Sequence, residues 1–141
     1  MVSIEGREDH VTETDGGWPT GIGAITLFAE DLAATREFYE RAFGLPVVFE
    51  DPNSAVFKFG ATLINLLDVR EAAELVAPAS VGGPDAGARM QFTINVEDVD
   101  ATCADLERRG VRLLNGPMDR PWGIRTAAFA DPAGNVWEIA T

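Results

Sequence analysis

The chain has 141 residues, of which 46% are hydrophobic and 24% charged, and its formal net charge is −12. These values are typical of one soluble globular domain and exclude a disordered or collagen-like chain. The acidic charge and scattered basic residues argue against a nucleic-acid partner, and the single cysteine, Cys103, excludes an intrachain disulfide and a cysteine-based metal cage.

Residues 1–20 (MVSIEGREDHVTETDGGWPT) are polar, acidic and without periodicity, which predicts a flexible leader that contains the only histidine, His10. This leader lacks the basic and apolar regions of a signal peptide. No apolar run approaches the roughly 20 residues of a membrane span. We therefore expect a cytoplasmic protein with no membrane partner.

Residues 21 to about 69 have the pattern of a β-α-β-β-β unit. The run GAITLFAE alternates like a strand, and Asp31 can cap a helix that ends at Gly44. Three strand-like runs follow, PVVFED, SAVFKFG and ATLINLLD, separated by turn residues. Residues from about 70 to 89 end in a Gly/Pro-rich stretch and are typical of a connector.

The same pattern returns over residues 90–141. MQFTINV has the alternation of a strand, Asp98 can cap a helix that ends at Gly110, and VRLLN, GIRTAAFA and GNVWEIA are three more strand-like runs. Aligning residues 25–42 with 92–109 gives far more identities than the one or so expected by chance. The identical pairs are Thr26/Thr93, Glu30/Glu97, Asp31/Asp98, Ala34/Ala101, Thr35/Thr102, Glu40/Glu107 and Arg41/Arg108. We infer a duplicated unit and an α+β domain, in which each sheet carries a helix on one face and leaves the other free to line a cleft.

Strand alternation determines which side chains face this cleft. Four repeat-related positions are assigned to it: Ala24, Asn65, Gln91 and Glu138. Only Glu138 is ionisable, and an unpaired carboxylate in an otherwise apolar strand is costly to bury. Three interpretations of Glu138 remain open: a wet side chain or one paired with Arg125 or Arg89, a metal ligand or general base, and a contact to a polar ligand.

Four more residues are candidates for the cleft or its rim. Trp122 in RPWGIR belongs to a predicted hairpin, where it either stacks on a ligand or makes an ordinary rim or dimer contact. Arg125 follows on the next strand and either binds a carboxylate or neutralises Glu138. Phe57 and Phe59 share one strand face and are either core or pocket wall.

The paired units, the two strand-into-helix segments and the ending FADPAGNVWEIA resemble the glyoxalase, bleomycin resistance and extradiol dioxygenase superfamily, also called vicinal oxygen chelate proteins. The likeness covers about residues 21–141, and the pattern FxDPxGNxxE is its most specific part. It implies paired βαβββ modules that form a cup-shaped, incomplete β-barrel, often completed in a homodimer. In the metalloenzyme branches it also implies one divalent metal, held at four positions that map onto Ala24, Asn65, Gln91 and Glu138.

This sequence departs from that metal pattern, because Ala24 has no donor atom and Asn65 is an uncommon ligand. Only Gln91 and Glu138 match the ligand types of glyoxalase-like members, whereas a catalytic transition metal normally needs at least three protein ligands. We therefore expect no cofactor, although two ligands and water can hold a divalent ion such as Mg²⁺ weakly.

The resemblance thus favours a protein that binds a small organic molecule in its cup, as in the metal-free branch, where an acidic dimer sequesters a cationic drug. The expected polar contacts are Asn65, Gln91 and Glu138, and the expected walls are Trp122, Phe57 and Phe59. The alternative is a metal-dependent lyase, isomerase or dioxygenase acting on vicinal oxygens, with Gln91 and Glu138 as ligands and Glu138 as a proton shuttle. A third interpretation is a scaffold or regulatory dimer with a vestigial cup.

Overall fold

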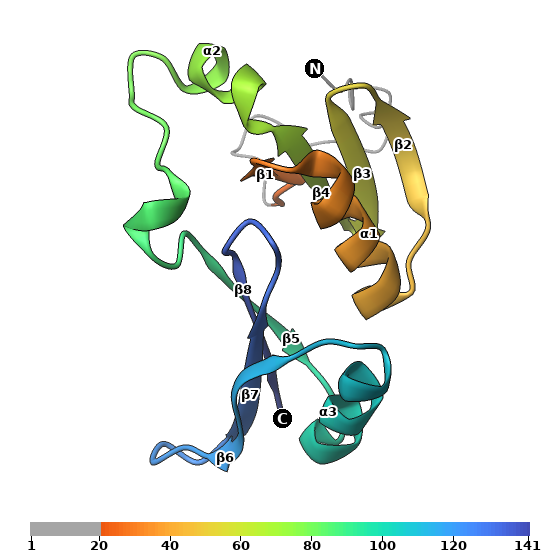
Figure 1. The fold of residues 1–141 in the computed structure, drawn as a ribbon. Helices are drawn as coiled ribbons and strands as arrows, with labels where there is room; N and C mark the ends of the chain where they lie inside the picture. The colour runs from red at the N-terminus through yellow and green to blue at the C-terminus, as the bar shows by residue number, and fades with distance from the viewer. Residues whose placement is uncertain (1–20) are drawn as a thin grey trace, which may run out of the picture.

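The computed structural model describes residues 21–141, so the predicted leader and His10 lie outside the described residues. Two halves repeat the order strand, helix and three strands, as the sequence predicts (Figure 1). The first half contains β1 (Ala24–Ala29), α1 (Leu32–Phe43), β2 (Val47–Asp51), β3 (Ser54–Phe59) and β4 (Thr62–Asp68). The second contains β5 (Gln91–Asn95), α3 (Val99–Arg108), β6 (Leu113–Asp119), β7 (Arg125–Ala130) and β8 (Val136–Ala140). The connector holds the short helix α2 (Ala72–Val76) and two single 3-10 turns (Val69–Glu71 and Pro84–Ala86).

Each half forms a four-stranded sheet with the same topology. The strand orders are β1-β4-β3-β2 and β5-β8-β7-β6. The pairs β1/β4 and β5/β8 are parallel, and the other neighbours are antiparallel. Within residues 21–141 the two sheets share no ladder, so they form no closed barrel.

No helix of this part of the chain is long and apolar enough to span a membrane.

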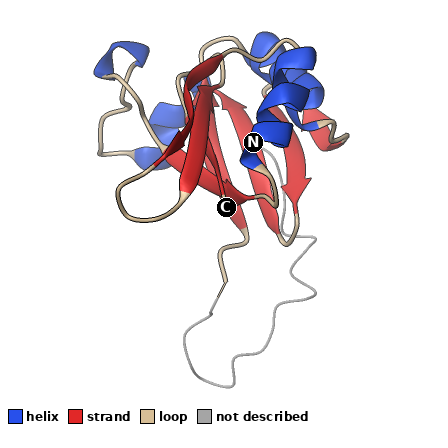
Figure 2. Cartoon of the chain, turned by 90° about the horizontal axis from the view of Figure 1, so that it is seen from below, coloured by secondary structure: helices blue, strands red, loops and turns tan. Residues whose placement is uncertain are grey.

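Both long helices begin where the sequence predicts. The carboxylates of Asp31 and Asp98 each accept a hydrogen bond at 3.0 Å from the backbone N–H three residues later, which satisfies a donor that the first helical turn leaves free. α1 ends at Gly44, whose left-handed backbone (φ 66°) lets its N–H return to the carbonyl of Glu40. Figure 2 shows the two long helices gathered on one flank of the strands.

One hydrophobic core unites the two halves. The helix-bearing faces of both sheets contribute to it, and α1 lies between them. Phe43 of α1 and Phe59 of β3 pack on the indole of Trp137 from β8, with ring centroids 4.9 and 5.2 Å away. Because both helix-bearing faces meet in this core, the opposite faces of the two sheets lie away from it.

A buried polar cluster fastens α1 to the loop between β7 and β8. The hydroxyl of Tyr39 donates to Asp131 at 2.7 Å and accepts from the indole N–H of Trp137 at 3.1 Å. Asp131 also accepts the backbone N–H groups of Ala133 and Asn135, both at 2.9 Å. Burial and the charge of Asp131 raise the pKa of Tyr39 well above its usual range. The DPxGN segment of the resemblance therefore closes a turn and holds the two halves together.

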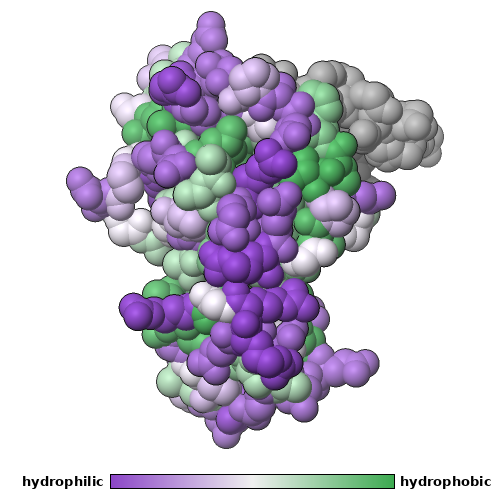
Figure 3. Space-filling view, turned by 45° about the vertical axis from the view of Figure 1, so that its right-hand side comes forward, coloured by the Kyte–Doolittle hydropathy of each residue, from purple (hydrophilic) through white to green (hydrophobic). Residues whose placement is uncertain are grey.

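The C-terminal ends of the two helices make a reciprocal contact. The guanidinium of Arg41 donates to the carbonyls of Arg109 and Gly110, at 3.2 and 3.3 Å. Arg109 in turn donates to the carbonyl of Ala42 at 3.3 Å. Each arginine thus satisfies carbonyl groups at or just beyond the end of the other helix. Hydrophilic residues cover the junction of the two halves on this side of the molecule (Figure 3).

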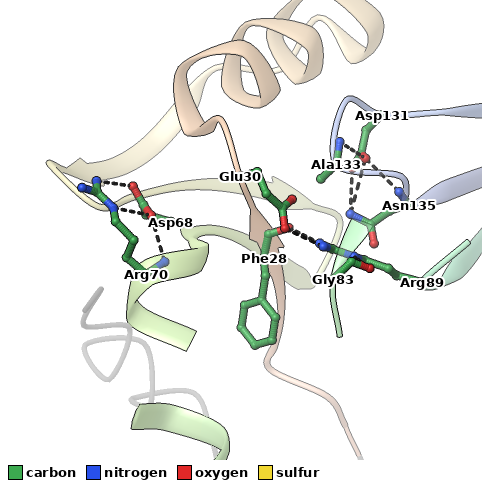
Figure 4. Close-up of polar contacts among 9 residues, drawn as sticks. All are labelled: Phe28, Glu30, Asp68, Arg70, Gly83, Arg89, Asp131, Ala133 and Asn135. Atoms are coloured by element: carbon green, nitrogen blue, oxygen red, sulfur yellow. Dashed lines mark hydrogen bonds and ion pairs between the residues drawn. The ribbon is translucent and has the colours of Figure 1, made fainter. Parts of the chain in front are cut away.

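Hydrogen bonds and ion pairs hold both ends of the connector (Figure 4). At its start, hydrogen bonds from Arg70 lower the pKa of Asp68 to about 2. At its end, Arg89 donates to the Phe28 carbonyl at 3.1 Å and pairs with Glu30 at 2.6 Å. The Arg89 side chain is only 12% exposed, so this ion pair fixes where the second half begins.

Candidate functional site

On the face of the second sheet that lies away from the core, the part formed by β5 is polar and open. Along β5, Gln91, Thr93 and Asn95 are exposed, and Phe92 and Ile94 between them pack on the core. Glu138 of β8 lies directly beside Thr93 in the parallel register. The Thr93 hydroxyl donates to Oε1 of Glu138 at 2.8 Å, so one carboxylate oxygen is held and the other is left for a further partner.

No cationic side chain of residues 21–141 pairs with Glu138. Arg89 pairs with Glu30 instead. Arg125 bonds to both Asp100 of α3 at 3.1 Å and Asp119 of β6 at 3.0 Å, and these bonds raise its pKa above the usual value. The interpretation that Arg125 neutralises Glu138 is therefore wrong, because the acids of α3 and β6 hold its guanidinium.

The equivalent face of the first sheet is more deeply buried around Asn65. Asn65 is 1% exposed, and Ala24, Val56 and Leu63 form a small apolar cluster on the same face. The Asn65 amide donates to the Thr26 hydroxyl at 3.3 Å, and its Oδ1 has no hydrogen-bond partner. Exchanging the amide oxygen and nitrogen does not remove the deficit, since one end then still lacks a partner.

The two threonines are the feature of the site that the sequence analysis missed. Thr26 and Thr93 form an identical pair in the repeat, and no role is predicted for either of them from the sequence. The register places Thr26 opposite Asn65 and Thr93 opposite Glu138, whereas Ala24 lies opposite Leu63. The signal was present in the repeat, because both threonines lie two residues after Ala24 and Gln91 on the same strand face.

Two of the three aromatic residues assigned to the cleft or its rim belong to the core instead. Phe57 is fully buried, with its ring centroid 5.6 Å from that of Tyr39, and Phe59 packs on Trp137. The pocket-wall interpretation of both is wrong, because their strand face is the one that carries α1. Trp122 is 68% exposed at the turn between β6 and β7, with the Arg120 guanidinium 5.9 Å from its ring centroid.

The described residues do not fit the four-ligand metal site. Residues 21–141 contain no group of three or more His, Cys, Asp or Glu side chains that could hold a metal ion. Ala24 supplies no donor, and Asn65 and Glu138 belong to separate sheets that share no ladder. Gln91 lines a shallow depression of about 360 Å³ with Ala88, Arg89, Met90 and Val136, a lining without a carboxylate.

Comparison with known proteins supports the resemblance. Residues 21–139 match the model of the Glyoxalase/Bleomycin resistance protein/Dioxygenase superfamily. The chain belongs to this superfamily. A Bacillus subtilis (strain 168) protein described as "Uncharacterized protein YraH" is 38% identical over 120 residues, which cover 82% of this chain and 93% of that protein.

Solved structures of this superfamily share the fold. A glyoxalase/bleomycin resistance protein/dioxygenase from Nocardioides has a TM-score of 0.77 and 27% identity, covering 94% of this chain and 87% of its own. Lactoylglutathione lyase from Agrobacterium tumefaciens has a TM-score of 0.68 and 28% identity, covering 86% and 93%. These matches show that the chain has a glyoxalase-type fold. Because one fold supports many different reactions, the chemistry must be inferred from the residues of the site.

Proposed function

We propose that this protein binds and sequesters a small cationic organic molecule, with Glu138 as the anionic contact and Gln91, on the same face of the sheet, as a further polar contact. The observation that carries the proposal is a carboxylate on an open, polar strand face without a cationic partner among residues 21–141. An uncompensated carboxylate in a partly buried position attracts a cation and donates no hydrogen bond of its own.

A second copy of the chain supplies the wall that faces this strand across the ligand. Gln91, Thr93 and Asn95 form a bare strand face in the single chain, and a ligand there would remain largely in water. Small-molecule sites usually enclose most of their ligand. The cup implied by the superfamily is often completed in a homodimer, and a facing copy would enclose the ligand.

Replacing Glu138 by glutamine is expected to weaken the binding of a cationic aromatic amine about tenfold, the size expected for loss of one charge-assisted contact. Calorimetric titration with tryptamine measures this change, and indole-3-ethanol serves as the neutral ligand of similar shape. The control variant is Glu97→Gln, which removes the same charge from an exposed position just after β5. Equal affinities of the two variants, or equal binding of the amine and the alcohol by the unaltered protein, would contradict the proposal.

A metal-dependent enzyme is the second candidate, and the unpaired Oδ1 of Asn65 favours it because amide oxygens bind divalent cations. Thermal-shift titrations with Mg²⁺, Mn²⁺, Ni²⁺, Zn²⁺ and Fe²⁺ distinguish the two, since a metal that binds only the folded protein raises its melting temperature. We expect no stabilisation that depends on the candidate ligands. A metal-dependent rise that Gln91→Ala or Glu138→Ala abolishes would establish the enzyme instead.

A further inference from the structure

The repeat-related threonines make the same kind of contact in both halves, in opposite surroundings. Each threonine lies on the first strand of its unit and bonds to the side chain directly beside it on the central strand. The Thr26–Asn65 pair is part-buried and neutral, with Asn65 itself 1% exposed. The Thr93–Glu138 pair is open to solvent and charged. One arrangement has therefore been kept while its surroundings and charge have diverged.

The open pair contributes little to folding. A hydrogen bond between exposed strand side chains competes with water and stabilises a sheet only slightly. Its clearer effect is on the geometry of Glu138, whose carboxylate loses rotational freedom when Oε1 is held. A carboxylate that is already oriented loses less entropy when a ligand binds its second oxygen.

The buried pair is costly to disturb. Thr26 is the partner that Asn65 has among residues 21–141, and the flanking Ala24, Val56 and Leu63 provide no side-chain hydrogen bond. Removing the Thr26 hydroxyl would leave both ends of a buried amide unpaired, which lowers stability.

We propose that the two halves have divided these roles: Thr93 is a positioning residue that orients Glu138 toward the ligand, whereas Thr26 and the buried Asn65 form a structural counterpart. This inference rests on the proposed function, and it adds that the recognition site is asymmetric between the repeats. The sequence identity of the two threonines thus conceals two different roles.

The paired variants Thr93→Val and Thr26→Val test this division, because valine retains the branched shape and strand preference of threonine without the hydroxyl. We expect Thr93→Val to weaken tryptamine binding about tenfold with an unchanged melting temperature, and Thr93→Ser to restore the affinity. We expect Thr26→Val to lower the melting temperature by about 5 °C and to leave the affinity within about twofold. Thr62→Val, at a half-buried position of β4, is the control for loss of a strand hydroxyl.

A ligand-free measurement separates this inference from the proposed function. The carboxyl ¹³C resonance of Glu138 at neutral pH should move in Thr93→Val, return in Thr93→Ser and stay unchanged in Thr26→Val. An unmoved resonance together with unaltered affinity in Thr93→Val would overturn the positioning role. Equal losses of affinity in both valine variants, without a change in stability, would overturn the asymmetry. If Glu138→Gln does not weaken tryptamine binding, the proposed function is overturned. The carboxyl resonance of Glu138 then still decides whether Thr93 orients this side chain.

Discussion

Replacing Gly116 by alanine is expected to destabilise the protein by about 3–5 kcal/mol, because left-handed strain and a steric clash act together there. Gly116 lies within β6 at φ +84°, a region that side chains disfavour. A Cβ atom on it would lie 2.5 Å from the Thr126 carbonyl oxygen and 2.6 Å from Cα of Ala127. Both atoms are backbone of the neighbouring strand β7, so relief requires the strands to separate. Urea denaturation followed by circular dichroism measures the loss.

The same substitution at Gly123 separates the two causes. Gly123 has a similar backbone conformation, φ +99°, and an added Cβ would meet nothing within 4 Å. Alanine there is expected to cost about 1–2 kcal/mol from backbone strain alone. If both variants lost the same free energy of unfolding, the close approach of β6 to β7 would not contribute to the cost of the Gly116 substitution.

Replacing Asp131 by alanine is expected to lower the free energy of unfolding by about 3–4 kcal/mol, since it leaves several buried donors without an acceptor. The hydroxyl of Tyr39 and the N–H groups of Ala133 and Asn135 all donate to this carboxylate. Asp131 is 4% exposed, so water does not readily replace it. The urea midpoint at neutral pH, with the slope of the transition as a check on two-state unfolding, measures the effect.

Two comparators calibrate that effect. Tyr39→Phe removes the hydroxyl alone and is expected to cost about 1–2 kcal/mol. Asp98→Ala removes an exposed helix cap and is expected to cost about 1 kcal/mol. If Asp131→Ala lowered the free energy of unfolding no more than Asp98→Ala does, the buried cluster around Asp131 would not be what holds the two halves together.

The repeated secondary structure could be predicted from the sequence because its signals are local. Asp31 and Asp98 cap the helices as predicted, since a cap depends on a side chain and an N–H only three residues apart. Alternation likewise separates Gln91, Thr93 and Asn95 from Phe92 and Ile94 along β5. Period-two geometry is a property of the strand itself and needs no knowledge of its neighbours.

The partners of individual side chains were not predictable in this way. Alternation gives Phe57 and Phe59 a shared face, but the position of α1 decides that this face is core. The residues that hold Arg125 come from α3 and β6, so its guanidinium could not be assigned before the packing of these elements was known. Strand register, too, had to be observed before Thr26 and Thr93 became neighbours of Asn65 and Glu138.

The reciprocal contact of Arg41 and Arg109 with the opposite helix ends bears on the origin of the chain. In a twofold dimer of identical subunits the interface is self-complementary, so that each subunit makes the same contacts to the other. Here a similar form occurs within one polypeptide whose halves still share Thr26/Thr93 and Asp31/Asp98. The repeat alignment pairs Arg41 with Arg108, so the arginine that returns the contact, Arg109, lies one residue beyond the equivalent position. Joining the halves in one chain removes the requirement for exact symmetry, and a contact that identical subunits would make twice in the same way is made here by two arginines at different positions.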